Sequence, residues 1–511
     1  MSRILAYTSP ARGHLFPLTP VLDELQRRGH EISLRTLASQ APMMRGRGFN
    51  AAPISSHVEG IEHDDWRARN SREALGHAVR VMSERAKHDA PDLCRAIAEE
   101  RPDALLVDIN SWGAMAAAEA WGGPWSVFCP YPIPLTSRDA PPFGPGLPPA
   151  RGPLGRLRDH LVRPLVLGVL EKTFLPPLNH VRTQAGAAPV DDTDEMFRRP
   201  PLLIYMTAEP FDYPRRDWPE NIVMVGPCEW DPPSDPPEWL AELEHPIVVV
   251  TTSSEFQNDG RVVQAAFEAL ADEPVSVVAT LTADGHHDQI RVPANARVEQ
   301  FVPHGHLLDR AVCAVTHGGM GATQKALAHG VPVCVVPFGR DQLEVARRAE
   351  VAGAGTRLPA SRLRPDRLRG KIHQAMARAD GARRIADAFA AAGGAGAAAD
   401  AVETRLLGAV RERSQIASGR ASVAAQVVAA PGDGRCGARH LEPPPRHPFA
   451  GGGGDRLRPS ETEPGVHEQP RTDDHHQGLG DETRRVATTR DGARQEIDSG
   501  ETRGSKHSPR G

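Results

Sequence analysis

The segment 316–321, Thr-His-Gly-Gly-Met-Gly, has the residue types and spacing of an anion-binding turn. It follows an apolar run with the character of a β-strand and precedes a helical pattern. Glycine lets backbone N–H groups approach a ligand closely, and a helix N-terminus adds partial positive charge. These features predict a turn that binds a diphosphate. A glycine-rich strand-to-helix turn that binds nothing is the alternative.

Two familiar motifs that could explain such glycines are missing from the sequence. A dinucleotide-binding enzyme should carry G-x-G-x-x-G after its first strand, but segment 8–14 reads Thr-Ser-Pro-Ala-Arg-Gly-His. A serine hydrolase would pair His-Gly-Gly with a G-x-S-x-G elbow, which the sequence lacks. Both an oxidoreductase and a serine hydrolase are therefore disfavoured.

Other polar residues follow predicted strands. Asp341 and Gln342 come just past an apolar run at 333–336, and a carboxylate beside a carboxamide suits sugar hydroxyls. An aspartate that caps a helix is the more common explanation of such a pair. His14 opens a helical pattern at 15–28, where the helix dipole disfavours the imidazolium ion and so favours a ring that can accept a proton.

Short apolar runs alternate with helical periods from the N-terminus, which predicts parallel α/β architecture. In the first half, helices are expected at 15–28 and 114–121. The predicted strands of this half are Arg3–Thr8, Glu31–Arg35, Ala104–Asp108, Trp125–Cys129 and Leu202–Tyr205.

A Pro-rich acidic stretch separates this half from a second alternation of strands and helices. We predict an N-terminal domain at 1–227, a linker at 228–245 and a C-terminal domain at 246–430. Two doubly wound, Rossmann-like domains would face each other across a cleft that holds the ligands. Residues 431–511 are poor in apolar residues and rich in Gly and Pro, which predicts a disordered tail. The strands expected in the second half are Ile247–Thr251, Val275–Ala279, Ala296–Gln300, Cys313–Thr316 and Val333–Val336, with helices at 262–270, 321–328 and 343–352.

Five pieces of sequence in this order resemble the donor-binding signature of the GT-B glycosyltransferases of family 1. That family includes the UDP-glycosyltransferases and the bacterial macrolide and antibiotic glycosyltransferases. The resemblance covers about residues 1 to 410 and implies a GT-B enzyme. The pieces are Phe301-Val302-Pro303-His304, Leu307-Leu308, 317–321, Gly330-Val331-Pro332 and Asp341-Gln342.

The resemblance also implies a role for each matching residue. Phe301 would stack on the nucleotide base and the backbone of Val302 would read its edge, while Asp341 and Gln342 would hold the transferred sugar. His14 would be the general base and Asp108 the carboxylate that orients it. The reaction would then invert the anomeric carbon and need no metal. The diphosphate would be held by Ser254, His317, Gly318, Gly319, Met320 and Gly321.

The sequence departs from the family pattern at three positions. Lys325 stands where family members commonly place a glutamate that binds the ribose hydroxyls. We therefore expect a looser ribose contact, a dTDP-linked sugar without the 2′-hydroxyl, or a lysine that reaches a phosphate. Ser253 and His304 replace a usual glycine and glutamine and affect the details of donor geometry. The donor would be UDP- or dTDP-linked, and no other cofactor is expected.

Composition excludes several other classes of protein. The chain of 511 residues has 60 basic and 65 acidic residues and a net charge of -5, which disfavours a nucleic-acid binder. Six cysteines without C-x-x-C spacing indicate neither a zinc site nor a disulfide framework. The apolar window 161–178 is interrupted by charges and prolines, so no membrane span is predicted. A cytoplasmic monomer or weak dimer is expected.

The acceptor is the least specified part of the prediction. Region 130–190 is rich in Pro and Leu, with a helix at 154–178, and could form an apolar wall for a lipophilic natural product or lipid. Those leucines could equally belong to the core. The basic stretch 156–182 could also touch a membrane surface. A nucleotide-sugar epimerase or hydrolase of the same fold, or a non-catalytic nucleotide-binding partner protein, are the alternative functions.

Overall fold

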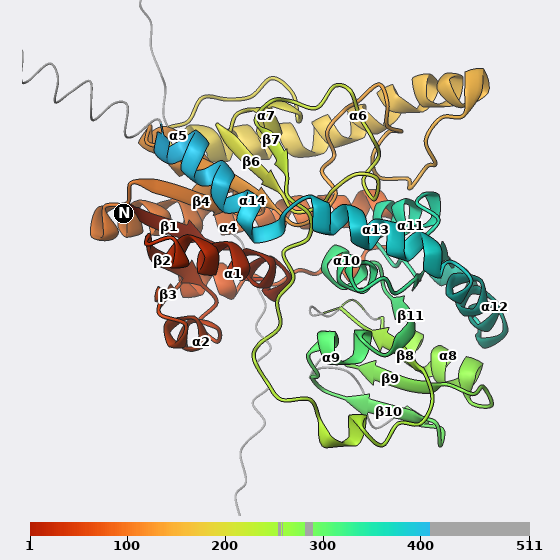
Figure 1. Ribbon diagram of the computed structural model, residues 1–511. Coiled ribbons are helices and arrows are strands. Elements are labelled where there is room, and N and C mark those ends of the chain that lie inside the picture. The colour runs from red at the N-terminus through yellow and green to blue at the C-terminus, as the bar shows by residue number, and fades with distance from the viewer. Residues whose placement is uncertain (254–256, 258, 282–289, 409–511) are drawn as a thin grey trace, which may run out of the picture. The chain divides into compact units, whose positions relative to one another are not determined.

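The structure of the chain is a computed structural model that describes residues 1–253, 257, 259–281 and 290–408 (Figure 1). The predicted tail, 431–511, lies outside the described residues. The described chain contains two parallel β-sheets, one in each half of the sequence. This architecture confirms the predicted α/β class.

The N-terminal sheet has seven strands, and all its paired strands run parallel. The five predicted strands are present with ends within one residue. Two edge strands were not predicted, because 50–53 is Asn-Ala-Ala-Pro and 222–224 is only three residues long. In spatial order the strands are β3 (Asn50–Pro53), β2 (Glu31–Thr36), β1 (Arg3–Tyr7), β4 (Ala104–Asp108), β5 (Trp125–Cys129), β6 (Leu202–Tyr205) and β7 (Ile222–Met224).

Helices connect these strands. The predicted helix at 114–121 begins two residues earlier, and the predicted helix at 154–178 extends to Gln184. The 30-residue helix 71–100 was not predicted. The helices of this half are α1 (Arg12–Arg27), α2 (Ala41–Gly46), α3 (Ser56–Glu59), α4 (Ser71–Glu100), α5 (Trp112–Trp121), α6 (Gly152–Gln184) and α7 (Glu195–Arg198), with a 3-10 turn at Asp65–Arg67.

The C-terminal sheet has six parallel strands, of which only the short edge strand 355–357 was not predicted. Its strands, in spatial order, are β10 (Ala296–Glu299), β9 (Ser276–Thr280), β8 (Ile247–Thr251), β11 (Ala311–Thr316), β12 (Val333–Val335) and β13 (Gly355–Arg357). The helices are α8 (Arg261–Leu270), α9 (His304–Leu308), α10 (Met320–Ala328), α11 (Gln342–Val351), α12 (Pro365–Met376) and α13 (Ala379–Ala391), with 3-10 turns at Glu238–Leu240 and Ala360–Arg362.

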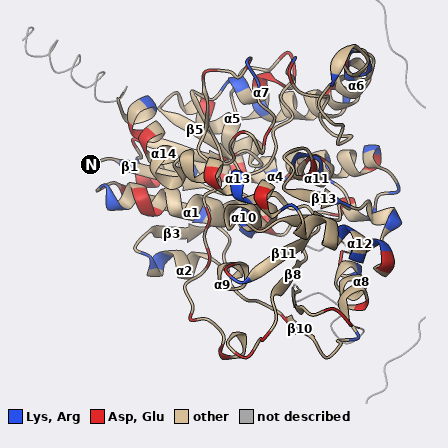
Figure 2. Ribbon diagram, turned by 45° about the vertical axis from the view of Figure 1, so that its right-hand side comes forward, with Lys and Arg blue, Asp and Glu red and all other residues tan. Residues whose placement is uncertain are grey.

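The sheets are buried on both faces, as parallel sheets usually are. In β1, Leu5 and Tyr7 pack into one apolar cluster, while Ile4 and Ala6 pack into another on the opposite face. The C-terminal sheet is covered in the same way on its two faces. Figure 2 shows that charged residues lie mostly on helices and loops, and the central strands are largely uncharged. Strand ends are therefore where polar side chains can reach a ligand.

The chain returns to its N-terminal half at the end of the described residues. Helix α14 (Gly394–Ala401) and a π-helical turn at Val402–Leu407 pack into the cluster beneath α1, and Figure 1 shows α14 beside that helix. Arg28 at the end of α1 donates to Asp400 and Glu403, both at 2.6 Å. The predicted boundary at residue 430 had assigned this segment to the C-terminal domain. Periodicity identifies a helix but does not reveal which core it joins.

This packing makes a testable prediction about stability. The Leu406 side chain is 1% exposed in that cluster, so Leu406→Ala should lower the free energy of unfolding by about 2–5 kcal/mol. Leu154→Ala is the matched control: Leu154 is 82% exposed, and its loss should change stability by less than about 0.5 kcal/mol. Urea unfolding of both variants measures the difference. Equal stability of the two would contradict the docking of 394–407 on the N-terminal half.

Candidate functional site

The ends of two neighbouring strands bring His14 and Asp108 together. Strands β1 and β4 pair in parallel, with Tyr7 opposite Val107, so both chains leave the sheet at the same edge. Asp108 is the last residue of β4, and His14 lies in the first turn of α1. The His14 Nδ1 is 2.8 Å from Asp108 Oδ1. The structure therefore joins the two residues that the sequence predicted as base and orienting carboxylate.

Asp108 is fully buried but remains a strong hydrogen-bond acceptor. Its Oδ2 accepts from the Ser9 N–H at 2.9 Å and the Ser9 hydroxyl at 2.7 Å, and Oδ1 also accepts from the Asn110 N–H at 2.9 Å. Burial raises the pKa of Asp108, but the interaction with His14 and these hydrogen bonds outweigh it and hold the pKa below its ordinary value. A carboxylate only accepts, so the proton of the His14 ring lies on Nδ1 and the Nε2 lone pair is left to take a proton.

Two glycines of the predicted anion-binding turn, Gly318 and Gly319, are required by close contacts. Gly318 has a φ of +98°, and a Cβ there would lie 3.0 Å from the Cβ of Gln342. A Cβ on Gly319 would lie 2.4 Å from Nε2 of His317. Gly319 caps helix α10, which begins at Met320, and Gly321 lies in its first turn with open space around it. The turn thus presents a helix N-terminus, as an anion site needs.

His317 lies buried against this turn. Burial lowers its pKa to about 4, and the positive charge of Arg340 contributes in the same direction. The ring is therefore neutral near pH 7 and can offer a phosphate an N–H donor but no charge. Its Nδ1 has no hydrogen-bond partner among the described residues.

Asp341 and Gln342 are placed differently from each other. The Gln342 Oε1 accepts from the N–H groups of Phe338 at 2.7 Å and Gly339 at 3.1 Å, and its Nε2 donates to Gln257 at 2.5 Å. Most of that carboxamide is therefore engaged within the protein. Burial raises the pKa of Asp341, while the positive charge of Arg340 and the electrostatic interaction with His14 oppose the rise. Asp341 of the C-terminal half thus lies within electrostatic reach of His14.

The other predicted donor residues lie in three different environments. Phe301 is 56% exposed, as a side chain that stacks on a base could be, whereas the side chain of Val302 is buried in the core. Lys325 pairs with Asp231 of the linker at 2.5 Å and donates to the Trp230 carbonyl at 3.3 Å. Ser254 lies outside the described residues.

Contacts between the two halves supply residues that sequence reasoning missed. Arg340, with a φ of +52°, donates from Nε and Nη2 to the two Asp65 oxygens at 2.8 Å each. Arg348 is fully buried and donates to Asp212 at 2.9 Å and Glu344 at 2.8 Å. Asp65 and Asp212 lie far from these arginines in sequence, so no local pattern signals the two contacts, whereas Glu344 is four residues before Arg348 on α11. Only the position of Arg340 beside Asp341 could have drawn attention to it.

The described residues limit two other kinds of site. No helix among them is long and apolar enough to cross a membrane. In the same residues, no three His, Cys, Asp or Glu side chains are grouped so that they could hold a metal ion.

Comparison with known proteins places this chain among glycosyltransferases. Residues 264–403 match the model of the erythromycin biosynthesis protein CIII-like C-terminal domain. The chain is 33% identical over 383 residues to 4′-demethylrebeccamycin synthase of Lentzea aerocolonigenes. The aligned region covers 71% of this chain and 89% of that protein.

Two solved structures have the same fold. The glycotransferase of kitacinnamycin superimposes with a TM-score of 0.63 at 22% identity, over 79% of this chain and 99% of the other. The spinosyn rhamnosyltransferase SpnG complexed with thymidine diphosphate gives a TM-score of 0.57 at 18% identity, over 78% and 100%. Fold and relatives define a nucleotide-sugar glycosyltransferase of the antibiotic and natural-product type. The chain belongs to the GT-B glycosyltransferases of family 1, as the resemblance implied.

The lowered pKa of His317 predicts a specific pH dependence of stability. As the pH falls, the His317 imidazole of the unfolded chain, with a pKa of about 6.5, becomes protonated at a higher pH than that of the folded chain. The stability from burying the neutral ring is complete above pH 6.5 and is lost as pH falls toward 4. When the pH falls from 7.5 to 5, the free energy of unfolding should therefore decrease by about 2 kcal/mol less in His317→Gln than in the wild type. Urea unfolding at both pH values measures this difference.

The exposed His160 provides the control, since His160→Gln should keep the wild-type pH dependence. An identical pH response in His317→Gln and the wild type would contradict the buried, neutral state of His317.

Proposed function

We propose that the protein transfers a sugar from a nucleotide diphosphate to a hydroxyl of a small lipophilic acceptor, with inversion at the anomeric carbon and without a metal. One observation carries the proposal. The His14–Asp108 pair of the N-terminal half lies within electrostatic reach of Asp341, which belongs to the C-terminal half together with the glycine turn. A base and an anion site can thus act on one substrate from two sides.

The proposed reaction is a single displacement. His14 Nε2 takes the proton of the acceptor hydroxyl while its oxygen bonds to the anomeric carbon and the bond to the diphosphate oxygen breaks. Asp108 stabilises the imidazolium that forms. The backbone N–H groups at 318–321 and the neutral His317 ring donate to the leaving diphosphate, whose negative charge grows as it departs. Asp341 would accept from a hydroxyl of the transferred sugar.

This mechanism predicts how two substitutions affect turnover. His14→Ala should lower kcat by about 10²–10⁴-fold while nucleotide affinity stays near that of the wild type, because the base does not contact the nucleotide. Asp108→Asn should give a loss of similar size, because the Nδ1 proton loses its carboxylate partner. Steady-state kinetics and calorimetry with the nucleoside diphosphate measure the two effects. Full activity of His14→Ala would rule out its role as base.

The contact of Lys325 supports a dTDP-linked donor. Lys325 stands where family members commonly have a glutamate, and it is held by Asp231 at 2.5 Å. A lysine cannot accept a hydrogen bond from a ribose hydroxyl. A thymidine nucleotide lacks the 2′-hydroxyl and so loses less than a uridine nucleotide at such a site. The related solved structure with thymidine diphosphate agrees with this choice.

We predict that kcat/KM with a dTDP-linked sugar exceeds that with the UDP-linked form of the same sugar by about tenfold. That factor corresponds to one hydrogen bond left unmade. Lys325→Gln, which restores an acceptor, should narrow the preference, and Asp231→Asn controls for loss of the ion pair alone. Competition between the two donors, followed by mass spectrometry, measures the ratio. A clear UDP preference of the wild type would overturn this proposal.

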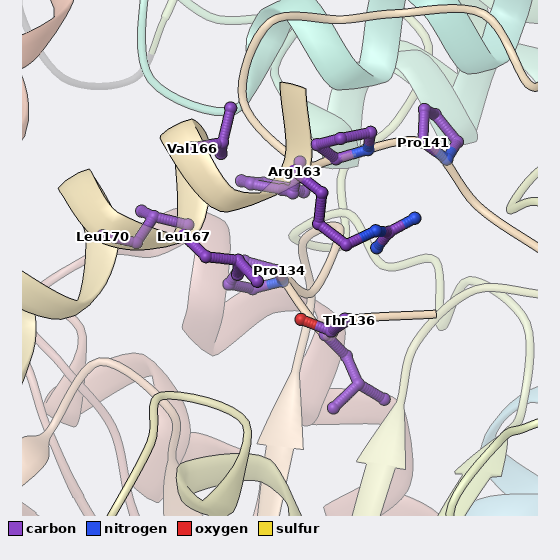
Figure 3. Close-up of a pocket in the computed structure, with 10 residues that line it drawn as sticks. Pro134, Thr136, Pro141, Arg163, Val166, Leu167 and Leu170 are labelled. Atoms are coloured by element: carbon purple, nitrogen blue, oxygen red, sulfur yellow. The ribbon is translucent and has the colours of Figure 1, made fainter. Parts of the chain in front are cut away.

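The acceptor would meet an apolar wall formed by α6 and the loop before it. Figure 3 shows Arg163, Val166, Leu167 and Leu170 of α6 beside Pro134, Thr136 and Pro141 of that loop. The cavity between them has a volume of only about 10 Å³, about enough for one water molecule, so the loop or α6 would have to shift before an acceptor could enter there.

The outer face of α6 exposes a stripe of apolar residues, to which we assign a peripheral contact with a membrane when the acceptor is lipidic. The stripe is Leu154, Leu157, Leu161, Leu165 and Val169. Because the cysteines among the described residues are free, we place the enzyme in the cytoplasm.

A further inference from the structure

The base nitrogen of His14 already has a partner in the protein. The Asn110 Nδ2 lies 3.2 Å from His14 Nε2, on the side of the ring opposite the contact with Asp108. Asn110 comes two residues after Asp108, and its own backbone N–H donates to the Asp108 carboxylate. The same short segment therefore holds both nitrogens of the imidazole.

Tyr131 determines which way the Asn110 amide faces. Its hydroxyl donates to Asn110 Oδ1 at 3.1 Å, and its ring lies 5.8 Å from the His14 ring between centroids. Tyr131 follows β5 and packs against apolar clusters of both halves. With Oδ1 engaged by Tyr131, the amide presents its NH₂ group to His14.

These contacts select one form of the ring. An NH₂ group only donates and a carboxylate only accepts, so Nε2 is the acceptor and Nδ1 carries the proton. This is the form that a general base needs. The nitrogen that must receive the acceptor proton is, however, occupied by Asn110.

We propose that Asn110 is a positioning residue that occupies the base nitrogen of His14 until an acceptor hydroxyl replaces it. The amide then donates to the oxygen of that hydroxyl and keeps its proton directed at Nε2. This inference rests on the proposed transfer reaction. In this role, Asn110 keeps water away from Nε2 of His14 while only the donor is bound.

The Asn110 contact matters because water can act as the nucleophile in the same displacement. A water molecule at Nε2 would pass a proton to His14, bond to the anomeric carbon and release the nucleoside diphosphate, so that the donor is hydrolysed. Water cannot reach Nε2 without breaking the Asn110 contact. A bound acceptor offsets that loss through its own apolar contacts, whereas water has none to offer.

Two substitutions at Asn110 test the inference in different ways. Asn110→Ala removes the amide, so the ratio of donor hydrolysis to sugar transfer should rise by about tenfold. Asn110→Asp keeps the shape but places a carboxylate at Nε2, which favours the protonated ring. The acidic limb of its kcat/KM profile should move to higher pH by about one unit or more. The other titratable groups around the ring, Asp108, Tyr131 and Asp341, are the same in both variants.

Tyr131→Phe provides a graded test with a matched control. It removes the hydroxyl that orients the amide and should raise the hydrolysis ratio by about two- to threefold. Tyr213→Phe removes another buried hydroxyl, one without a hydrogen-bond partner among the described residues, and should leave the ratio unchanged. Chromatography of nucleotide, free sugar and product after parallel incubations gives each ratio.

The results separate this inference from the proposed function. If the wild type transfers sugar but Asn110→Ala keeps its hydrolysis ratio and Asn110→Asp its pH profile, the inference alone is overturned. If the wild type neither transfers nor hydrolyses any nucleotide sugar, both fall. A readout without turnover is the ¹⁵N spectrum of histidine side chains, assigned with His14→Gln. At the same pH it should show a larger fraction of protonated Nε2 in Asn110→Asp than in the wild type.

Discussion

The hydrogen bond between His14 and Asp108 constrains the rest of this structure, because it requires β1 and β4 to be neighbours that end at one edge of the sheet. A buried carboxylate is tolerated only when hydrogen bonds satisfy it, and the Ser9 and Asn110 groups that do so come from the same two strand ends. The site is therefore a consequence of strand order. Substitutions at this edge of the sheet would alter the position of His14 more than the packing of the apolar core.

The second requirement is that the two halves meet at a defined distance. Ion pairs between the halves serve this purpose here: the buried Arg348 binds the buried Asp212, and the partly exposed Arg340 binds the buried Asp65. Such pairs are costly to bury unless their geometry is good, so they define one arrangement more than they add stability. The returning segment 394–407 joins the C-terminal half of the chain to the N-terminal core a second time. Asp341 thereby comes within electrostatic reach of His14.

Most of the central strands and the residues of the candidate site could be predicted from the sequence, whereas the edge strands and the long-range contacts could not. The central strands are nearly continuous apolar runs, and the glycine turn and the residues at strand ends follow from them. The edge strands β3, β7 and β13 are too short or too polar to predict. Contacts such as Arg340 with Asp65, or Tyr131 with Asn110, depend on how distant segments pack, which no local pattern encodes. The internal bonds of Gln342 also became visible only in the structure.

The central claim is that the base and the anion-binding turn act on opposite sides of one anomeric carbon. The stereochemistry of the first product tests it most directly. With an α-linked nucleotide sugar as donor, ¹H NMR of the glycoside as it forms should show a β-linkage at every early time point. A product that retains the α-configuration from the start would contradict a single displacement driven by His14.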